Sequence, residues 1–178
     1  WNPGAGTLVR EMQGHKMSVR SLAYSPDGLM LASASYDDTA RLWDVSSGAQ
    51  IRAFSDHSNR LTSIAFSPDG AWLITGSEDS TLRMHPMSGN APARVLTGHT
   101  APIRSIAIGA DGQSIVSASV DGTLARWDIG SGRRLSSASL AAGQLLAATG
   151  GAEAGGTIWV GGDGGATVVL SADGLERA

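Results

Sequence analysis

A chain of 178 residues, 42% of them hydrophobic and 16% charged, is long and apolar enough to bury a core, which excludes an intrinsically disordered protein. The formal net charge of −3 argues against nucleic acid as a partner, and the absence of cysteine excludes disulfides and thiolate metal sites. Because no apolar run approaches the ~20 residues of a membrane-spanning helix, we also expect no membrane partner.

Three kinds of position recur along the chain at a step of 42 residues. They are the histidines His15, His57 and His99, the aspartates Asp37, Asp79 and Asp121, and a turn sequence, Ser-Pro-Asp-Gly at 25–28 and 67–70 and Gly-Ala-Asp-Gly at 109–112. Trp1 lies one step before Trp43, and Asp163 lies one step after Asp121. About four periods therefore fit the chain without an insertion or deletion, which is the signature of a repeat architecture.

Within one period the sequence predicts four short strands and no helix. In the first complete period the strand-like segments are 19–25, 29–35, 39–45 and 49–54, and the turns between them contain Pro-Asp-Gly, Asp-Asp and Ser-Gly sequences. Four short antiparallel strands repeated every ~42 residues describe the blade of a β-propeller. We expect one domain over 1–178: an outer strand within 1–12 whose blade is completed elsewhere, complete repeats at 13–54, 55–96 and 97–138, and a degenerate terminal repeat at 139–178.

The combined pattern Gly-His, Ser-Pro-Asp-Gly, Leu-Ala-Ser-Ala-Ser-x-Asp-x-Thr and Leu-Trp-Asp resembles the WD-repeat β-propeller family over nearly the whole chain. The resemblance implies an all-β fold with about four blades of four antiparallel strands. Rings in this family usually hold seven or eight blades. The chain is then a fragment of a larger ring, or half of a homodimer that closes an eight-bladed ring by exchanging outer strands, or a self-closed ring of four.

The resemblance also implies a hydrogen-bonded chain of Trp, Ser or Thr, His and Asp inside each blade. Its members are His15, Ser33, Asp37 and Trp43 in the first complete repeat, His57, Thr75, Asp79 and His85 in the second, and His99, Ser117, Asp121 and Trp127 in the third. The second repeat departs from the pattern, because His85-Pro86 stands where the others have Trp-Asp. We interpret His85 as a tolerated change in a structural network.

Two chemical alternatives follow from the same residues. Ser, His and Asp together are the groups of a serine hydrolase, but they recur in every repeat whereas a catalytic site is normally single. We therefore expect no enzyme, no catalytic residue and no cofactor. His57, Asp79 and His85 are also residue types that bind divalent metals, but a buried hydrogen-bonded arrangement is commoner, so we expect no metal.

Family members usually bind peptides or protein domains on one face of the ring, which three positions per blade line. Carried over to this chain, the positions are Ser18, Arg20 and Tyr36, then Arg60, Thr62 and Glu78, then Pro102, Arg104 and Val120. Arg20, Arg60 and Arg104 form a basic arc beside Tyr36, and such an arc suits an acidic or phosphorylated peptide. The alternative is that these arginines pair with Glu78 or with solvent and keep the face soluble.

The sequence thus predicts a non-catalytic protein-interaction scaffold, cytoplasmic, whose partners are a protein or peptide and further blades from the same chain or a second copy. Two other functions stay open. The chain is alternatively a sensor or autoinhibitory module of a larger signalling ATPase or kinase. A small-molecule or carbohydrate-binding propeller is disfavoured, because aromatic residues make up only 5% of the chain.

Overall fold

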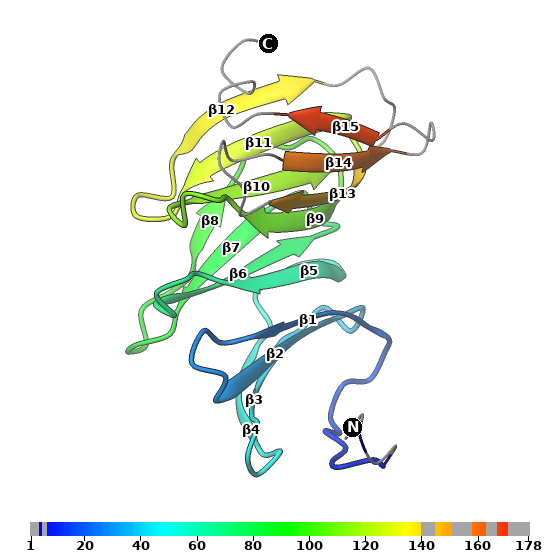
Figure 1. Ribbon diagram of the computed structural model, residues 1–178, viewed down its shortest axis with the longest axis vertical. Coiled ribbons are helices and arrows are strands. Elements are labelled where there is room, and N and C mark those ends of the chain that lie inside the picture. Colours follow the sequence, from blue (N-terminus) through cyan, green and yellow to red (C-terminus); the bar gives the residue numbers. More distant parts are fainter. Residues whose placement is uncertain (1–3, 5–6, 140–144, 151–157, 163–166, 171–178) are drawn as a thin grey trace.

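The computed structural model describes residues 4, 7–139, 145–150, 158–162 and 167–170. All regular secondary structure in these residues is β, arranged in four antiparallel sheets that follow one another in chain order (Figure 1). The first sheet contains β1 (Val19–Tyr24), β2 (Met30–Ser35), β3 (Ala40–Asp44) and β4 (Gln50–Phe54). The second contains β5 (Leu61–Phe66), β6 (Trp72–Ser77), β7 (Leu82–Pro86) and β8 (Arg94–Leu96). The all-β fold class predicted from the sequence is confirmed.

The third sheet contains β9 (Ile103–Ile108), β10 (Ser114–Ser119), β11 (Thr123–Asp128) and β12 (Arg134–Ser139). In the described part of the last repeat, β13 (Leu145–Gly150), β14 (Ile158–Gly162) and β15 (Thr167–Leu170) form a three-stranded sheet. Each strand pairs with its neighbours in the sequence, as expected for strands joined by short turns. The boundaries predicted for the repeats stay a prediction.

The turn between the first two strands of each four-stranded sheet is fixed by an Asp-Gly pair. Gly28 has a φ of 73°, in the left-handed region that glycine adopts without a steric penalty. The Asp27 side chain accepts the backbone N–H of Leu29 over 3.0 Å, and Ser25 Oγ accepts that of Met30 over 2.9 Å. The repeated turn sequence therefore sets where β1 ends and β2 begins.

The core lies between successive sheets. Leu61, Ile64 and Phe66 of β5 pack against the first sheet, where small residues such as Ala32 and Ala34 leave room for them. The interface between the second and third sheets is formed in the same way. Its buried apolar residues, from both sheets, are Ile74, Leu82, Met84, Leu96, Ile103, Ile106, Ile115, Ala125, Trp127 and Ile129. Burial of these side chains at about 25 cal/mol per Å² is the main stabilising contribution to the stack of sheets.

Serine side chains also join the first strands of neighbouring sheets, which lie next to one another in Figure 1. The backbone N–H of Ile64 donates to Ser21 Oγ over 3.3 Å, and one repeat later that of Ile106 donates to Ser63 Oγ over 3.1 Å. Thr62 Oγ1 donates to the carbonyl of Ile103 over 2.7 Å. The first three sheets are therefore tied to one another by hydrogen bonds as well as by apolar contact.

Part of the outer strand expected within 1–12 falls on the described residues 7–12. Thr7 makes a single bridge, and residues 8–12 have no regular secondary structure. A strand needs a neighbour for its N–H and C=O groups, whereas this segment instead places the Arg10 guanidinium on the carbonyl of Val45 at 2.6 Å. The pairing of this segment with a blade completed elsewhere stays a prediction.

Candidate binding face and the hydrogen-bond networks of the sheets

In the third sheet, the Trp127 indole begins a chain of hydrogen bonds that leads to a carboxylate. Its Nε1–H donates to Ser117 Oγ over 2.8 Å, and this hydroxyl lies 2.7 Å from Nε2 of His99. Because an indole N–H can only donate, the hydroxyl proton is left for the imidazole. The Nδ1 side of His99 then faces Thr123 Oγ1 at 2.9 Å and the Asp121 carboxylate at 3.4 Å.

The first sheet brings its four predicted residues together in the same order. Trp43 Nε1 donates to Ser33 Oγ over 2.8 Å, and Ser33 Oγ lies 2.6 Å from His15 Nε2. His15 Nδ1 lies 3.0 Å from Asp37 Oδ2, which also accepts the backbone N–H of Lys16. The carboxylate therefore anchors both the imidazole and the segment that leads into β1.

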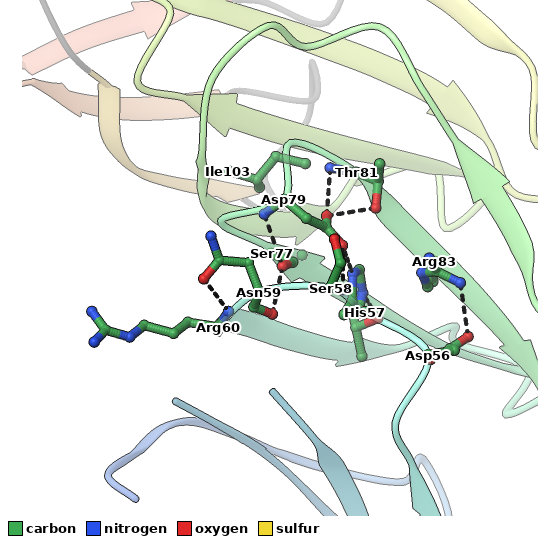
Figure 2. A network of polar contacts seen from close by, with 12 residues as sticks. Asp56, His57, Ser58, Asn59, Arg60, Ser77, Asp79, Thr81, Arg83 and Ile103 are labelled. Atoms are coloured by element: carbon green, nitrogen blue, oxygen red, sulfur yellow. Dashed lines mark hydrogen bonds and ion pairs between the residues drawn. The ribbon is translucent and has the colours of Figure 1, made fainter. Parts of the chain in front are cut away.

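In the second sheet an imidazole replaces the indole at the end of the chain. His57 Nδ1 lies 2.7 Å from Asp79 Oδ2, and His57 Nε2 lies 2.8 Å from Thr75 Oγ1 (Figure 2 shows His57 beside Asp79). Thr75 Oγ1 is 3.2 Å from Nε2 of His85. With the Thr75 proton given to His57, His85 must donate from Nε2, so the side chain supplies the same kind of donor as an indole.

Burial and hydrogen bonding move the pKa values of these groups in opposite directions. Burial lowers the pKa of His57 and His99 below the usual value, and lowers that of His85 to about 4. Burial would raise the pKa of Asp79, but hydrogen bonds from Thr81 and His57 hold it at about 2. At neutral pH the networks of the second and third sheets therefore consist of neutral imidazoles and ionised carboxylates.

The replacement of the indole is coupled to a second replacement that sequence reasoning missed. Gly98 and Gly14 have φ values of 152° and 156°, which favour glycine. A Cβ atom at Gly98 would lie 2.9 Å from the guanidinium of Arg134 and 3.4 Å from Cη2 of Trp127, and one at Gly14 would meet the guanidinium of Arg41 before Cη2 of Trp43 at 3.3 Å. In the second sheet this glycine position is occupied by Asp56. The available signal was the sequence Asp-His at 56–57, where the other two repeats have Gly-His.

Asp56 occupies space that the smaller imidazole leaves free. Its carboxylate lies 3.2 Å from the guanidinium of Arg83 (Figure 2) and 3.8 Å from His85 Nδ1. The His85 ring lies 4.5 Å from the Phe54 ring of the first sheet, centroid to centroid. A hollow of about 420 Å³, lined by these side chains and by residues 90–93, remains beside His85.

Pro86 changes how the second sheet ends. Asp44 and Asp128, at the same position in the other sheets, donate their backbone N–H to Ala49 and Arg133, and their carboxylates accept N–H groups of the following turn. Proline has no N–H and no carboxylate, so it can do neither. Pairing with β8 accordingly stops at Met84, and β8 has only three residues.

The geometry does not favour the metal alternative for His57, Asp79 and His85. Both ring nitrogens of His57 lie within hydrogen-bond distance of Asp79 and Thr75. No group of three His, Asp or Glu side chains is arranged to hold a metal ion in the part of the chain that the structure describes.

Backbone hydrogen bonds join six of the nine predicted face positions in pairs at one end of the sheets. The N–H of Tyr36 donates to the carbonyl of Ser18 over 3.0 Å, that of Glu78 to Arg60 over 2.9 Å, and the same bond joins Val120 to Pro102. Each bond connects the residue after the second strand to the segment that enters the first strand. The predicted positions are therefore neighbours within each sheet.

The three arginines of the predicted arc are not equivalent. Arg104 forms an ion pair with Glu78, with an N–O distance of 2.5 Å, as the solubility alternative anticipated. The guanidinium carbon atoms of Arg20 and Arg60 lie 5.1 and 5.0 Å from the centroid of the Tyr36 ring. Within the described ranges neither of these two guanidiniums has a carboxylate partner.

A hollow of about 410 Å³ lies beside the arc, lined by Arg20, Tyr36, Thr62 and Arg104. The Thr62 hydroxyl is directed inward, because it donates to backbone carbonyls of Gly76 and Ile103. In Figure 2 the Arg60 side chain extends away from the His57–Asp79 cluster. The arc is therefore a basic surface with a cavity, separate from the polar network of the sheet.

The chain matches the family described as WD domain, G-beta repeat over residues 6–44, 48–85 and 90–128. The chain belongs to the WD-repeat family. Nuclear distribution protein PAC1 of Arthroderma otae is 49% identical over 45 residues, which cover 25% of this WD-repeat chain and 10% of that protein. Periodic tryptophan protein 2 homolog of Neurospora crassa is 42% identical over 45 residues, 25% of this chain and 5% of that protein.

Ribosome assembly protein 4 of Saccharomyces cerevisiae is 44% identical over 45 residues, which cover 25% of this chain and 9% of that protein. The WD-repeat chain thus matches a tenth or less of the length of each of these three relatives. In its described residues the chain contains no helix that is long and apolar enough to cross a bilayer.

A second candidate surface of this WD-repeat chain is the open face of its first sheet. Three positions of the first sheet are exposed to solvent, whereas the equivalent positions of the second sheet are buried against the first. Leu61, Ile64 and Phe66 are 1%, 5% and 7% exposed, whereas Val19, Leu22 and Tyr24, one repeat earlier, are 46%, 60% and 64% exposed. Among the residues that the structure describes, the first sheet therefore carries the side chains of a sheet-packing face with no sheet packed against them.

Proposed function

We propose that this chain is a non-catalytic protein-interaction module of the WD-repeat family that binds an acidic segment of a partner protein at Arg20, Arg60 and Arg104. The observation that carries the proposal is that Arg20 and Arg60 hold uncompensated positive charge on a chain whose formal net charge is −3. Unpaired guanidiniums beside a tyrosine are typical of binding hot spots. The names of the relatives, which refer to assembly and distribution, are consistent with protein partners. We propose that the chain acts in the cytoplasm.

The proposal is tested by affinity capture from a library of acidic peptides, with the Arg20→Ala/Arg60→Ala double variant compared with the unaltered chain. Arg133→Ala is the matched control for charge, because Arg133 is exposed and lies in the turn at the opposite end of its sheet. We expect the double variant to lose at least tenfold in affinity, about 1.4 kcal/mol, and the control to bind normally. Equal binding by all three proteins would contradict the proposal.

We also propose that the open face of the first sheet, formed by Val19, Leu22 and Tyr24, packs against a further blade, either from the same longer chain or from a second copy. The proposal is supported by the burial of the equivalent residues in the next sheet. Light scattering over a range of concentrations separates the two sources. Self-association that Leu22→Glu removes, and Leu135→Glu on β12 does not, indicates a second copy. A chain that stays monomeric excludes the second copy as the source.

A further inference from the structure

The charges on the predicted binding face define how much negative charge a ligand should bring. Four charged side chains occupy its nine positions, and one pair, Arg104 and Glu78, is internally neutral. The remaining two, Arg20 and Arg60, leave a local charge of +2. A single carboxylate neutralises only one of them, whereas the dianion of a phosphate monoester neutralises both and offers three acceptor oxygens.

Tyr36 organises these two guanidiniums before any ligand binds. Arg20 belongs to β1 of the first sheet, and Arg60 immediately precedes β5 of the second, so the two side chains converge on the ring from different sheets. A guanidinium held over an aromatic ring keeps its N–H groups, which lie in its plane, available for acceptors. The Tyr36 ring therefore has a guanidinium from each of two sheets beside it without an anion.

The hollow beside Arg20 and Tyr36, which Arg60 does not line, limits the size of the ligand. Its volume is about 410 Å³, and Arg104 and Thr62 line it together with Arg20 and Tyr36. A space of this volume accepts a phosphorylated side chain and part of its backbone. Surfaces that bind nucleic acid or anionic membranes instead need many clustered cations, and the described part of this face has only two without a partner.

We propose that Arg20, Tyr36 and Arg60 form a clamp for one phosphorylated serine, threonine or tyrosine of a partner peptide. This inference rests on the proposed function, because it names the acidic group that the face takes. Arg20 and Arg60 each donate to the phosphate oxygens, and Tyr36 fixes their position by stacking. Arg104 is held by Glu78 at the edge of the hollow, so this pair adds no net charge to the clamp.

The test uses immobilised peptide libraries with random flanking residues and a fixed central residue, phosphorylated in one set, unmodified in the second and glutamate in the third. The unaltered chain is expected to retain the phosphorylated set at least tenfold better than the glutamate set. Arg20→Ala and Arg60→Ala are each expected to reduce retention of the phosphorylated set about tenfold, and Arg133→Ala to leave it unchanged. Arg20→Lys keeps the charge but loses the paired N–H donors, so it should recover only part of the binding. Thermal unfolding checks that each variant is folded.

The outcomes separate this inference from the proposed function. If phosphorylated and glutamate peptides bind equally and both need Arg20 and Arg60, the acidic-partner function stands and the phosphate clamp is wrong. If neither set binds through these arginines, both are wrong. Vesicles with 5% phosphatidylinositol bisphosphate serve as the competing probe, and binding to vesicles without binding to peptides would also overturn the clamp. A phosphate ligand further predicts that peptide binding weakens below about pH 6, where the dianion takes up a proton.

Discussion

The second and third sheets are built on the same 42-residue repeat, yet different side chains fill the position at the end of the hydrogen-bond network: His85 in the second sheet and Trp127 in the third. In the third sheet Gly98 lets the Trp127 indole lie against the backbone. In the second sheet Asp56 carries a side chain at that place, and the smaller ring of His85 leaves room for it. The comparison shows that the two positions differ together: the third sheet has glycine beside the indole, and the second has aspartate beside the imidazole.

The same comparison explains the outer strand of each sheet. Asp128 caps the turn that follows β11, and β12 pairs with β11 over five positions. Pro86 cannot cap the turn after β7, and β8 pairs over only three positions. The loss of the Trp-Asp sequence therefore affects the core through Trp and the strand connection through Asp.

The largest expected difference in stability between the two sheets comes from removing the indole or its replacement. Trp127→Ala is expected to cost about 3–5 kcal/mol in the free energy of unfolding, because a large buried side chain leaves a cavity and Ser117 loses its donor. His85→Ala is expected to cost less than half of that, since the imidazole is smaller and already borders a hollow. Urea denaturation measures both, and equal losses would contradict the comparison.

Removal of the central hydroxyl has the next largest expected effect. Ser117→Ala leaves the Trp127 N–H and His99 Nε2 without a partner in a fully buried place, at about 2 kcal/mol. Thr75→Ala is expected to cost less, because water can reach His85 from the adjacent hollow. Ser131→Ala, in an exposed turn, is the control. A larger loss for Thr75→Ala than for Ser117→Ala would show that the hollow does not hydrate the second network.

The pH dependence of stability separates the two networks through His85. Its pKa is about 4 in the folded chain, below the unfolded value of 6.5, so the unfolded chain binds a proton first as the pH falls. The contribution of neutral His85 to the free energy of unfolding is therefore fully present above about pH 6.5. It declines as the pH falls from about 6.5 to 4 and stays constant below that. Between pH 6.5 and 5 the unaltered chain should lose about 1 kcal/mol more than His85→Gln. Groups facing His85, namely Asp56, His57, Arg83 and Arg52, are present in both proteins. Parallel stability curves would exclude this role.

The pairing of the two exchanged positions can be measured directly in a double-mutant cycle. His85→Trp alone should clash with the Asp56 side chain, and Asp56→Gly alone should leave an unfilled space. The double variant restores the arrangement of the third sheet, so we expect it to be more stable than the sum of the single effects by at least about 0.5 kcal/mol. Additive effects would show that the two positions are independent.

The sequence was sufficient to predict the all-β fold because its signals are local and repeated. Asp-Gly turns set strand ends, and a constant step of 42 residues fixed which positions are equivalent. The members of each network were implied by the family resemblance, and hydrogen bonds join Ser33 to His15 and Thr75 to His57. What the repeat could not supply was the response to a change in it. The short β8 and the ion pair of Asp56 with Arg83 depend on how the neighbouring side chains pack where the indole is absent.

The face shows the same limit. The face positions implied by the family resemblance grouped Arg20, Arg60 and Arg104, but they did not show how these arginines differ. Arg104 has Glu78 within reach, whereas Arg20 and Arg60 have Tyr36 between their sheets. Partners that come from adjacent sheets are set by the angle between those sheets, which no single repeat encodes. The distinction between a neutralised and a free cation therefore needed coordinates.

The serine hydrogen bonds between successive first strands have a consequence for how the stack loses structure. Ser63 Oγ accepts the backbone N–H of Ile106. Unfolding of the second sheet therefore removes the hydrogen-bond acceptor of this N–H group of the third sheet. Stability is thus transmitted between nearest neighbours, as in a one-dimensional cooperative array, and disruption spreads from a damaged repeat to the one that follows it. The solvent exchange rate of the Ile106 amide hydrogen becomes a local reporter of whether the preceding repeat is intact.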